Sequence, residues 1–399
     1  MSGVAVEGGD GDGGVGSTDF TPEQLARGRA LRRRQVPWVL GGRLVGLAVT
    51  LLLGFTPAGA HLVHWAGGLL GGSRTAQVLG GALALVLIGQ LVGLPVAARV
   101  RVIRADYGLV TQGWAGWAVD LLRGLLLTLV LALPVALGVY ALTAWSTRWW
   151  WAPAAGAAAL LTVVFSFLFP LLVEPLFNRF TALPDGELRS ALLALAERDG
   201  VRVRDVLVAD ASRRTTALNA YVSGFGATRR IVAYDTLLST AEQREVELVV
   251  AHELGHVVHR DVPRGTALGA LGAAAAVVVL GLLAALHPLQ AAAGVPDLAD
   301  PRSLPLLAAL AAVLGTLGGP AQAAVSRRIE AAADRHALEL TGDPQQFIAM
   351  QRRLALTNVA DVDPPRALEL LFATHPSTAR RIAAARRWAS ATTAPESSR

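Results

Sequence analysis

The sequence contains no cysteine and no lysine among its 399 residues. The absence of cysteine excludes disulfides, thiolate metal ligands and cysteine nucleophiles. All basic residues are therefore arginine, which together with abundant alanine, glycine and proline indicates a GC-rich genome, as in many bacteria. Charge is also scarce, because only 17% of residues are charged whereas soluble domains carry about 25%. This composition, with a mean hydropathy of +0.46, predicts a membrane protein.

The net charge of +6 has two interpretations. In a soluble chain it would suggest a nucleic-acid partner. Here the arginines cluster beside long apolar segments, so we interpret them as a signal of membrane topology and expect no nucleic-acid partner.

Six apolar segments approach the length of about 20 residues that a membrane-spanning helix needs. A Gly-rich stretch around residues 61–72 adds a seventh candidate, which is short or re-entrant. The sequence therefore predicts a mainly α-helical, polytopic bundle of six or seven transmembrane helices in contact with the lipid bilayer. The six segments are residues 38–58, 76–98, 122–144, 152–173, 265–286 and 303–325.

The distribution of arginine predicts the orientation of the chain. Arginines gather before the first segment (Arg27, Arg29 and Arg32 to Arg34) and after the second (Arg99, Arg101 and Arg104), whereas the alternate loops carry few. Because loops rich in basic residues stay in the cytoplasm, we expect a multi-pass cell membrane protein with both termini and the polar stretch 174–262 on the cytoplasmic side.

The polar and apolar stretches divide the chain into six predicted regions. These are a disordered basic tail (1–36), an N-terminal transmembrane region (37–173), a cytoplasmic catalytic segment (174–262), two transmembrane helices (263–325), C-terminal catalytic helices (326–388) and a frayed tail (389–399). Within residues 174–262 the hydrophobic pattern predicts a helix over 185–199 and strands over 201–209, 218–222 and 230–234. Thr240 and Gln243 have the spacing of a capping box for the next helix.

That next helix carries His252-Glu253-Leu254-Gly255-His256. Histidines at positions i and i+4 share a helix face, so both can bind one metal ion. A catalytic zinc keeps one position open for water, and the intervening Glu253 is placed to act as general base on that water. The motif predicts a zinc hydrolase that needs a third protein ligand.

Glu330 and Asp334 are the candidates that complete such a site. They also lie at i and i+4, after the sixth apolar segment, and Ala331 to Ala333 leave little bulk near them. One carboxylate can bind zinc, and the other can accept a hydrogen bond from a ligand histidine and so fix its orientation. An ordinary solvated helix with arginine–acid pairs is the alternative.

These motifs resemble those of the membrane gluzincins that include the type I CAAX prenyl proteases. The matching pieces cover the C-terminal half of the chain in the family's order and spacing. They are Pro175-Leu-Phe-Asn-Arg-Phe-Thr-Ala-Leu-Pro184, Asn219-Ala-Tyr221, Arg230-Ile-Val-Ala-Tyr-Asp-Thr-Leu-Leu238, the HExxH motif, Glu330-x-x-x-Asp334 and His375-Pro-x-x-x-x-Arg381. The resemblance implies an α+β gluzincin domain on the cytoplasmic side of the bundle.

The resemblance also implies roles for individual residues. One Zn²⁺ per chain would be bound by His252, His256 and Glu330, with Asp334 orienting a ligand histidine. Asn219 would lie on an edge strand that binds the substrate backbone, and His375 and Arg381 would stabilise the oxyanion. From the residues alone, Asn219 can equally be a turn residue, His375 a helix cap and Arg381 a surface charge. His259 and His336 are not expected to be ligands.

The sequence thus predicts a zinc-dependent integral-membrane endopeptidase. Its expected substrate is a peptide or membrane protein, including one with a lipidated C-terminal tail. An HtpX-like quality-control protease is an alternative within the same chemistry. A site-2-type protease is disfavoured because polar residues, Glu242 to Glu247, precede the motif. A transporter or a catalytically dead receptor-like membrane protein is the alternative from another class. The intact Glu253 argues against the dead protein, and the absence of a visible internal repeat argues against a transporter.

Overall fold

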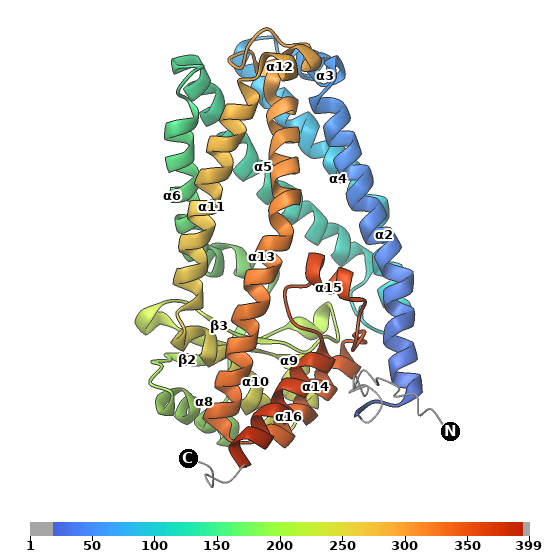
Figure 1. The fold of residues 1–399 in the computed structure, drawn as a ribbon, viewed down its shortest axis with the longest axis vertical. Helices are drawn as coiled ribbons and strands as arrows, with labels where there is room; N and C mark the ends of the chain where they lie inside the picture. Colours follow the sequence, from blue (N-terminus) through green and yellow to red (C-terminus); the bar gives the residue numbers. More distant parts are fainter. Residues whose placement is uncertain (1–18, 394–399) are drawn as a thin grey trace, which may run out of the picture.

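The computed structural model describes residues 19–393, in which a helical bundle stands on a smaller lobe that contains a sheet (Figure 1). Six helices in this part of the chain are long and apolar enough to cross a membrane, as the sequence predicts. They are α2 (Pro22–Gly54), α4 (Arg74–Asp106), α5 (Trp114–Trp145), α6 (Trp151–Leu168), α11 (Asp261–Ala284) and α13 (Leu304–Thr341). The π turn Phe169–Val173 and α7 (Glu174–Phe177) extend α6 towards the lobe.

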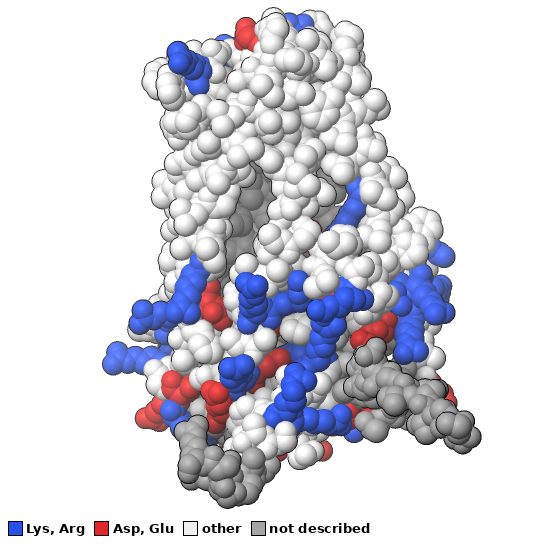
Figure 2. Space-filling model, in the orientation of Figure 1, with Lys and Arg blue, Asp and Glu red and all other residues white. Residues whose placement is uncertain are grey.

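Charged side chains are distributed unevenly along the bundle. On the face drawn in Figure 2 the upper half is almost entirely uncharged, whereas arginine and acidic side chains gather around the lower lobe. This division matches an apolar region within a bilayer and a polar lobe outside it.

Two short helices close the end of the bundle far from the lobe. They are α3 (Pro57–Gly68) and α12 (His287–Ala293). The twelve residues of α3 extend about 18 Å at 1.5 Å per residue, against a hydrocarbon core of about 30 Å. The seventh candidate segment is therefore a short helix that does not cross the bilayer.

Helix α2 begins at Pro22, so residues 22–36 are helical, whereas the sequence predicted a disordered tail there. Thr21 and Gln24 form a capping box, in which each side chain accepts the other's backbone N–H. Leu31 is buried, and Arg32 pairs with Asp361 of the lobe. Tertiary contacts thus order the basic segment; the rest of the predicted tail, residues 1–18, lies outside the described residues.

The lobe contains a four-stranded sheet with strand order β1-β2-β4-β3. Strand β2 is parallel to β4, and the two outer pairs are antiparallel. Three strands overlap predicted segments, β3 ending one residue beyond the predicted 218–222, whereas the three residues of β1 are too few to show an alternating pattern. The strands are β1 (Phe180–Ala182), β2 (Asp205–Ala209), β3 (Ala220–Ser223) and β4 (Arg230–Tyr234).

Six helices pack around the sheet and against the lower end of α13. They are α8 (Glu187–Arg198), α9 (Asp235–Thr240), α10 (Gln243–Val258), α14 (Pro344–Thr357), α15 (Arg366–Phe372) and α16 (Thr378–Thr393). The last of these continues five residues beyond the predicted end at 388. The remainder of the predicted frayed tail, 394–399, is outside the described residues.

The N-terminal cap of α10 differs from the predicted one. Glu242 is the cap residue and forms a capping box with Glu245. Thr240 instead ends α9, and its hydroxyl donates a hydrogen bond to the carbonyl of Thr236 at 2.8 Å. A separate short helix before α10 accounts for the shift.

A hydrophobic core fixes α10 inside the lobe. Val250 and Leu254 of α10 are fully buried together with Ile231 of β4, Ala337 of α13 and Phe347 of α14. Buried residues of the sheet, α13 and α14 therefore surround the helix that carries the HExxH motif, which limits movement of that helix.

Candidate metal centre

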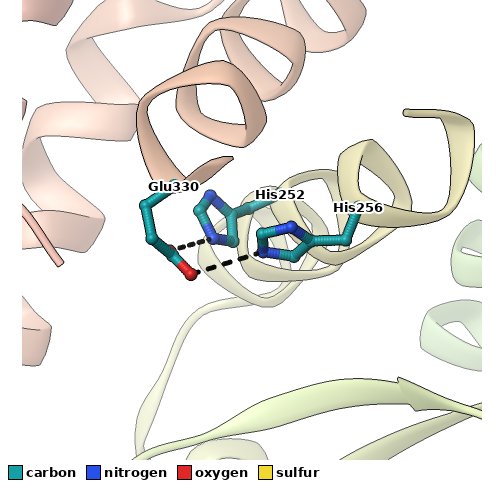
Figure 3. A group of neighbouring side chains, drawn as sticks. All are labelled: His252, His256 and Glu330. Carbon is teal, nitrogen blue, oxygen red and sulfur yellow. Dashed lines mark ion pairs between the residues drawn. The ribbon is translucent and has the colours of Figure 1, made fainter. Parts of the chain in front are cut away.

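The helix α10 brings its two motif histidines together. His252 and His256 are one helical turn apart, and their ring centroids are 4.9 Å from each other with the ring planes perpendicular. Both rings point towards Glu330, which comes from α13 (Figure 3). Residues separated by about 75 positions in the chain thus converge on one point.

Glu330 supplies a carboxylate to both histidines. Its Oε2 lies 3.2 Å from Nε2 of His252, and its Oε1 lies 3.8 Å from Nε2 of His256. The three candidate ligand atoms are all within 4.8 Å of one another. Two imidazole nitrogens and one carboxylate oxygen are the donor set of a catalytic zinc that keeps a fourth position open. The residues therefore fit a zinc ion.

Each histidine also contacts a carboxylate through its other ring nitrogen. Oδ1 of Asp334 lies 3.0 Å from Nδ1 of His252, and Oδ2 of Asp261 lies 2.9 Å from Nδ1 of His256. Such contacts fix the tautomer and orientation of a metal-binding imidazole. The sequence predicted a candidate of this kind in Asp334 but not in Asp261. Asp261 reaches His256 through a turn in which Arg260 is left-handed, with φ of 56°.

Gly255 allows α10 and α13 to approach closely beside the three candidate ligands. A Cβ atom at this position would lie 3.1 Å from Cβ of His336 and 3.2 Å from Cα of Ala333. Both distances are tighter than ordinary van der Waals contact. A side chain at residue 255 would therefore push apart the two helices that carry the candidate ligands.

A cleft of about 450 Å³ opens beside these residues. Glu253, the predicted general base, lines it, and burial raises the pKa of this carboxyl above its ordinary value. The other predicted site residues that line the cleft are Asn219, His252, His375 and Arg381.

Arg381 is buried beside Asp334 and is not a surface charge. Its Nε donates to Oδ2 of Asp334 at 2.8 Å, and its side chain is 14% exposed. The amide of Gln351, turned so that its oxygen faces the guanidinium, accepts from Nη2 of Arg381 at 3.0 Å. No sequence pattern indicated Gln351, which is buried where α14 packs against α16.

His375 lies over the other side of Glu330. Its Nε2 is 3.2 Å from Oε2 of Glu330, and burial lowers the pKa of the imidazole. Arg327 of α13 supports this segment, because its Nη1 donates to the carbonyls of Glu369 and Ala373, at 3.0 and 2.7 Å. His375 lies in the loop between α15, which ends at Phe372, and α16, which begins at Thr378, so it is not a helix cap.

Asn219 immediately precedes β3, the edge strand of the sheet. Its carbonyl accepts a hydrogen bond from the backbone N–H of Tyr234 at 3.0 Å, and its side chain reaches the cleft. Among the described residues, β3 pairs only with β4, so its second edge has no partner strand.

The two remaining histidines near α10 form a separate cluster. Nε2 of His336 lies 2.9 Å from Oδ2 of Asp199, and the His336 ring is 5.5 Å from the ring of His259. Neither histidine is part of the three-residue group described above.

The carboxylates around His252 favour the protonated form of its imidazole. Burial acts to lower the pKa of its imidazole, but the hydrogen bonds to Asp334 and Glu330 outweigh burial and raise the pKa to about 9. In the absence of a metal ion, the His252 imidazole therefore carries a proton, and its positive charge is stabilised by the two carboxylates.

Comparison with protein families identifies the two parts of the chain separately. Residues 182–389 match the model of peptidase family M48. Residues 17–179 match the model described as CAAX prenyl protease N-terminal, five membrane helices.

The individual relatives of the chain are also named as proteases. The chain is 35% identical to the uncharacterized metalloprotease YhfN of Bacillus subtilis over 321 residues, which is 77% of this chain and 73% of that protein. It is 33% identical to a CAAX prenyl protease 1 homolog of Oryza sativa over 44% of this chain and 42% of that relative. The crystal structure of S. mikatae Ste24p has the same fold, with a TM-score of 0.83 and 21% identity over 92% of this chain and 90% of that one.

Proposed function

Because the chain belongs to peptidase family M48, and is thus a membrane metalloendopeptidase as its sequence predicts, we propose a role for each residue of the metal centre. His252, His256 and Glu330 bind one Zn²⁺ ion. Asp334 orients His252. The observation that carries this proposal is the convergence of the three ligand atoms within 4.8 Å of one another.

A zinc ion held there would polarise the scissile carbonyl and lower the pKa of an attacking water molecule towards about 7. Glu253 takes the proton from this water and transfers it to the leaving amine. Its buried position, which raises its pKa, suits a group that must both accept and release a proton.

The substrate is held in the cleft beside Glu253. An extended peptide adds to the open edge of β3, with Asn219 at the start of that strand. His375 and Arg381, which line the same cleft, stabilise the negative charge that develops on the carbonyl oxygen.

A membrane protein or a peptide with a lipidated C-terminal tail is the proposed substrate class. The relatives named CAAX prenyl protease 1 support this class. An apolar cavity of about 900 Å³ within the bundle, between α5, α6, α11 and α13, has the size and chemistry to accept an acyl or prenyl chain. The second candidate substrate class is unlipidated membrane proteins, as in quality control. Substrate profiling that compares lipidated with unlipidated substrates would distinguish the two classes.

The proposed orientation places the lobe, and with it the metal centre, in the cytoplasm of a bacterial cell. The arginine-rich segments before the first span and after the second lie at the lobe end of the bundle. Loops rich in basic residues remain on the cytoplasmic side.

The purified protein in detergent tests the proposal. We expect about one zinc ion per chain, and we expect Glu253→Gln to keep that zinc while losing activity on a peptide by about 10²- to 10⁴-fold. Glu330→Ala should lose most of the metal because it removes a ligand. A parent protein without bound metal, or a Glu253→Gln variant as active as the parent, would contradict the proposal.

A further inference from the structure

The loop that follows α14 lies between the candidate cleft and helix α2. On one side, Asn358 and Ala360 line the same cleft as His252 and Glu253. On the other side, Val359 is buried in a small cluster with residues of α2 and α4. Loop 358–361 is thus in contact with both the cleft and the helices of the bundle.

Asn358 connects this loop to the edge strand. Its Oδ1 accepts a hydrogen bond from the backbone N–H of Leu218 at 3.2 Å. Leu218 is buried and lies two residues before Ala220, the first residue of the edge strand. A side chain that follows α14 therefore fixes the start of the strand to which an extended substrate would add.

The backbone of the loop is strained at the next residue. Val359 has φ of 48°, in the left-handed region that a β-branched residue rarely adopts. Strained residues persist only where surrounding contacts hold them, and they occur often where a protein holds a ligand. The contacts that hold Val359 come from α2 and α4.

The N-terminal turns of α2 brace the loop at two points. Gly28 is buried against the backbone of Ala360, and a Cβ atom at Gly28 would overlap with the carbonyl oxygen of Ala360. Arg32 pairs through its Nε with the buried carboxylate of Asp361. Residues 22–36 thus hold loop 358–361 by close packing and by charge.

We propose that Asn358 is a substrate-positioning residue of this protease, and that α2 keeps it in place through Gly28 and Arg32. The inference rests on the proposed binding of substrate along β3. Loss of the Asn358 side chain frees the start of the strand while leaving the metal ligands and Glu253 untouched. Substrate binding should therefore weaken more than the chemical step.

Steady-state kinetics with an internally quenched apolar peptide tests this inference. Removal of one hydrogen bond that leaves a buried N–H unpaired typically corresponds to about a tenfold change in affinity. We expect Asn358→Ala to raise KM about tenfold and to leave kcat and the zinc content nearly unchanged. Asn358→Asp keeps an acceptor for Leu218 and should restore KM towards that of the parent.

Two variants of α2 distinguish the effect of its contact with loop 358–361 from general effects of substitution in this helix. Arg32→Gln removes the pair with Asp361 and should raise KM in the same direction as Asn358→Ala. Arg29→Gln is the matched control, because Arg29 is an exposed residue of α2 whose side chain forms no ion pair or hydrogen bond among the described residues. Its KM should equal that of the parent.

Binding of the same peptide to the Glu253→Gln variant gives a result that does not depend on turnover. An about tenfold higher Kd on addition of Asn358→Ala supports the inference. An unchanged Kd, or a loss of kcat and zinc in place of the rise in KM, overturns it. Failure of the proposed function would give a different result from failure of this inference. In that case the parent protein would lack zinc, or its activity would not depend on Glu253.

Discussion

Oδ2 of Asp261 lies 2.9 Å from Nδ1 of His256, so the first residue of a membrane helix contacts a residue of the metal centre. We expect Asp261→Asn to weaken zinc affinity by about 10- to 100-fold, because the imidazole loses the carboxylate that orients it. Competition with a chromophoric chelator measures this affinity. Asp185→Asn is the control, since the Asp185 side chain is 96% exposed and pairs with Arg189, not with a candidate zinc ligand; equal affinities in the two variants would contradict the role of Asp261.

Gly255→Ala should destabilise the protein and weaken its hold on zinc. The added methyl would meet Ala333 and His336 of α13 at 3.2 and 3.1 Å, and overpacking of this kind costs about 1–3 kcal/mol. Thermal unfolding in detergent and zinc content check both effects. Gly272→Ala is a matched substitution, because nothing lies within 4 Å of a Cβ atom there. It should leave zinc content unchanged and should not lower the melting temperature.

Zinc binding to the metal-free protein should release a proton from His252. Its pKa is raised to about 9, so the imidazole is protonated at pH 7.5, whereas a zinc ligand must be neutral. Zinc affinity should therefore fall as the pH decreases below about 9. Calorimetric titration at pH 7.5 in buffers with different ionisation enthalpies measures the release. A binding enthalpy that is the same in every buffer would contradict the prediction.

The absence of cysteine makes the orientation directly testable. Ala227→Cys places one thiol on the lobe, and Ala292→Cys places one in α12 at the opposite end. Both alanines are exposed, so the two substitutions are matched. In intact cells we expect a membrane-impermeant maleimide to label Ala292→Cys alone, and to label Ala227→Cys only after lysis. The reverse pattern would place the lobe outside the cytoplasm.

The parts of the site that the sequence could predict have a local or periodic origin. His252 and His256 share a face because of the helical repeat, and Glu330 with Asp334 repeats that spacing. Asp261 could not be found in this way, because its contact with His256 requires the left-handed turn at Arg260. The sequence does not reveal which non-glycine residue adopts such a turn.

The difference at residues 22–36 has another physical cause. Their arginines suggested a solvated tail, although Thr21-Pro22-Glu23-Gln24 carries the pattern of a helix start. What orders the segment is contact with loop 358–361, more than 300 residues away, which no local pattern encodes. Asn358 was overlooked for the same reason, since its importance comes from a single hydrogen bond to Leu218.

The long helix α13 has a consequence for the order of events during synthesis. His252 and His256 leave the ribosome well before Glu330, because α11 and the membrane-spanning part of α13 are synthesised between them and this carboxylate. With Glu330 as the proposed third zinc ligand, a nascent chain carries two imidazoles but an incomplete ligand set until α13 has been made. We therefore expect peptide hydrolysis to begin only after synthesis of the last membrane helix.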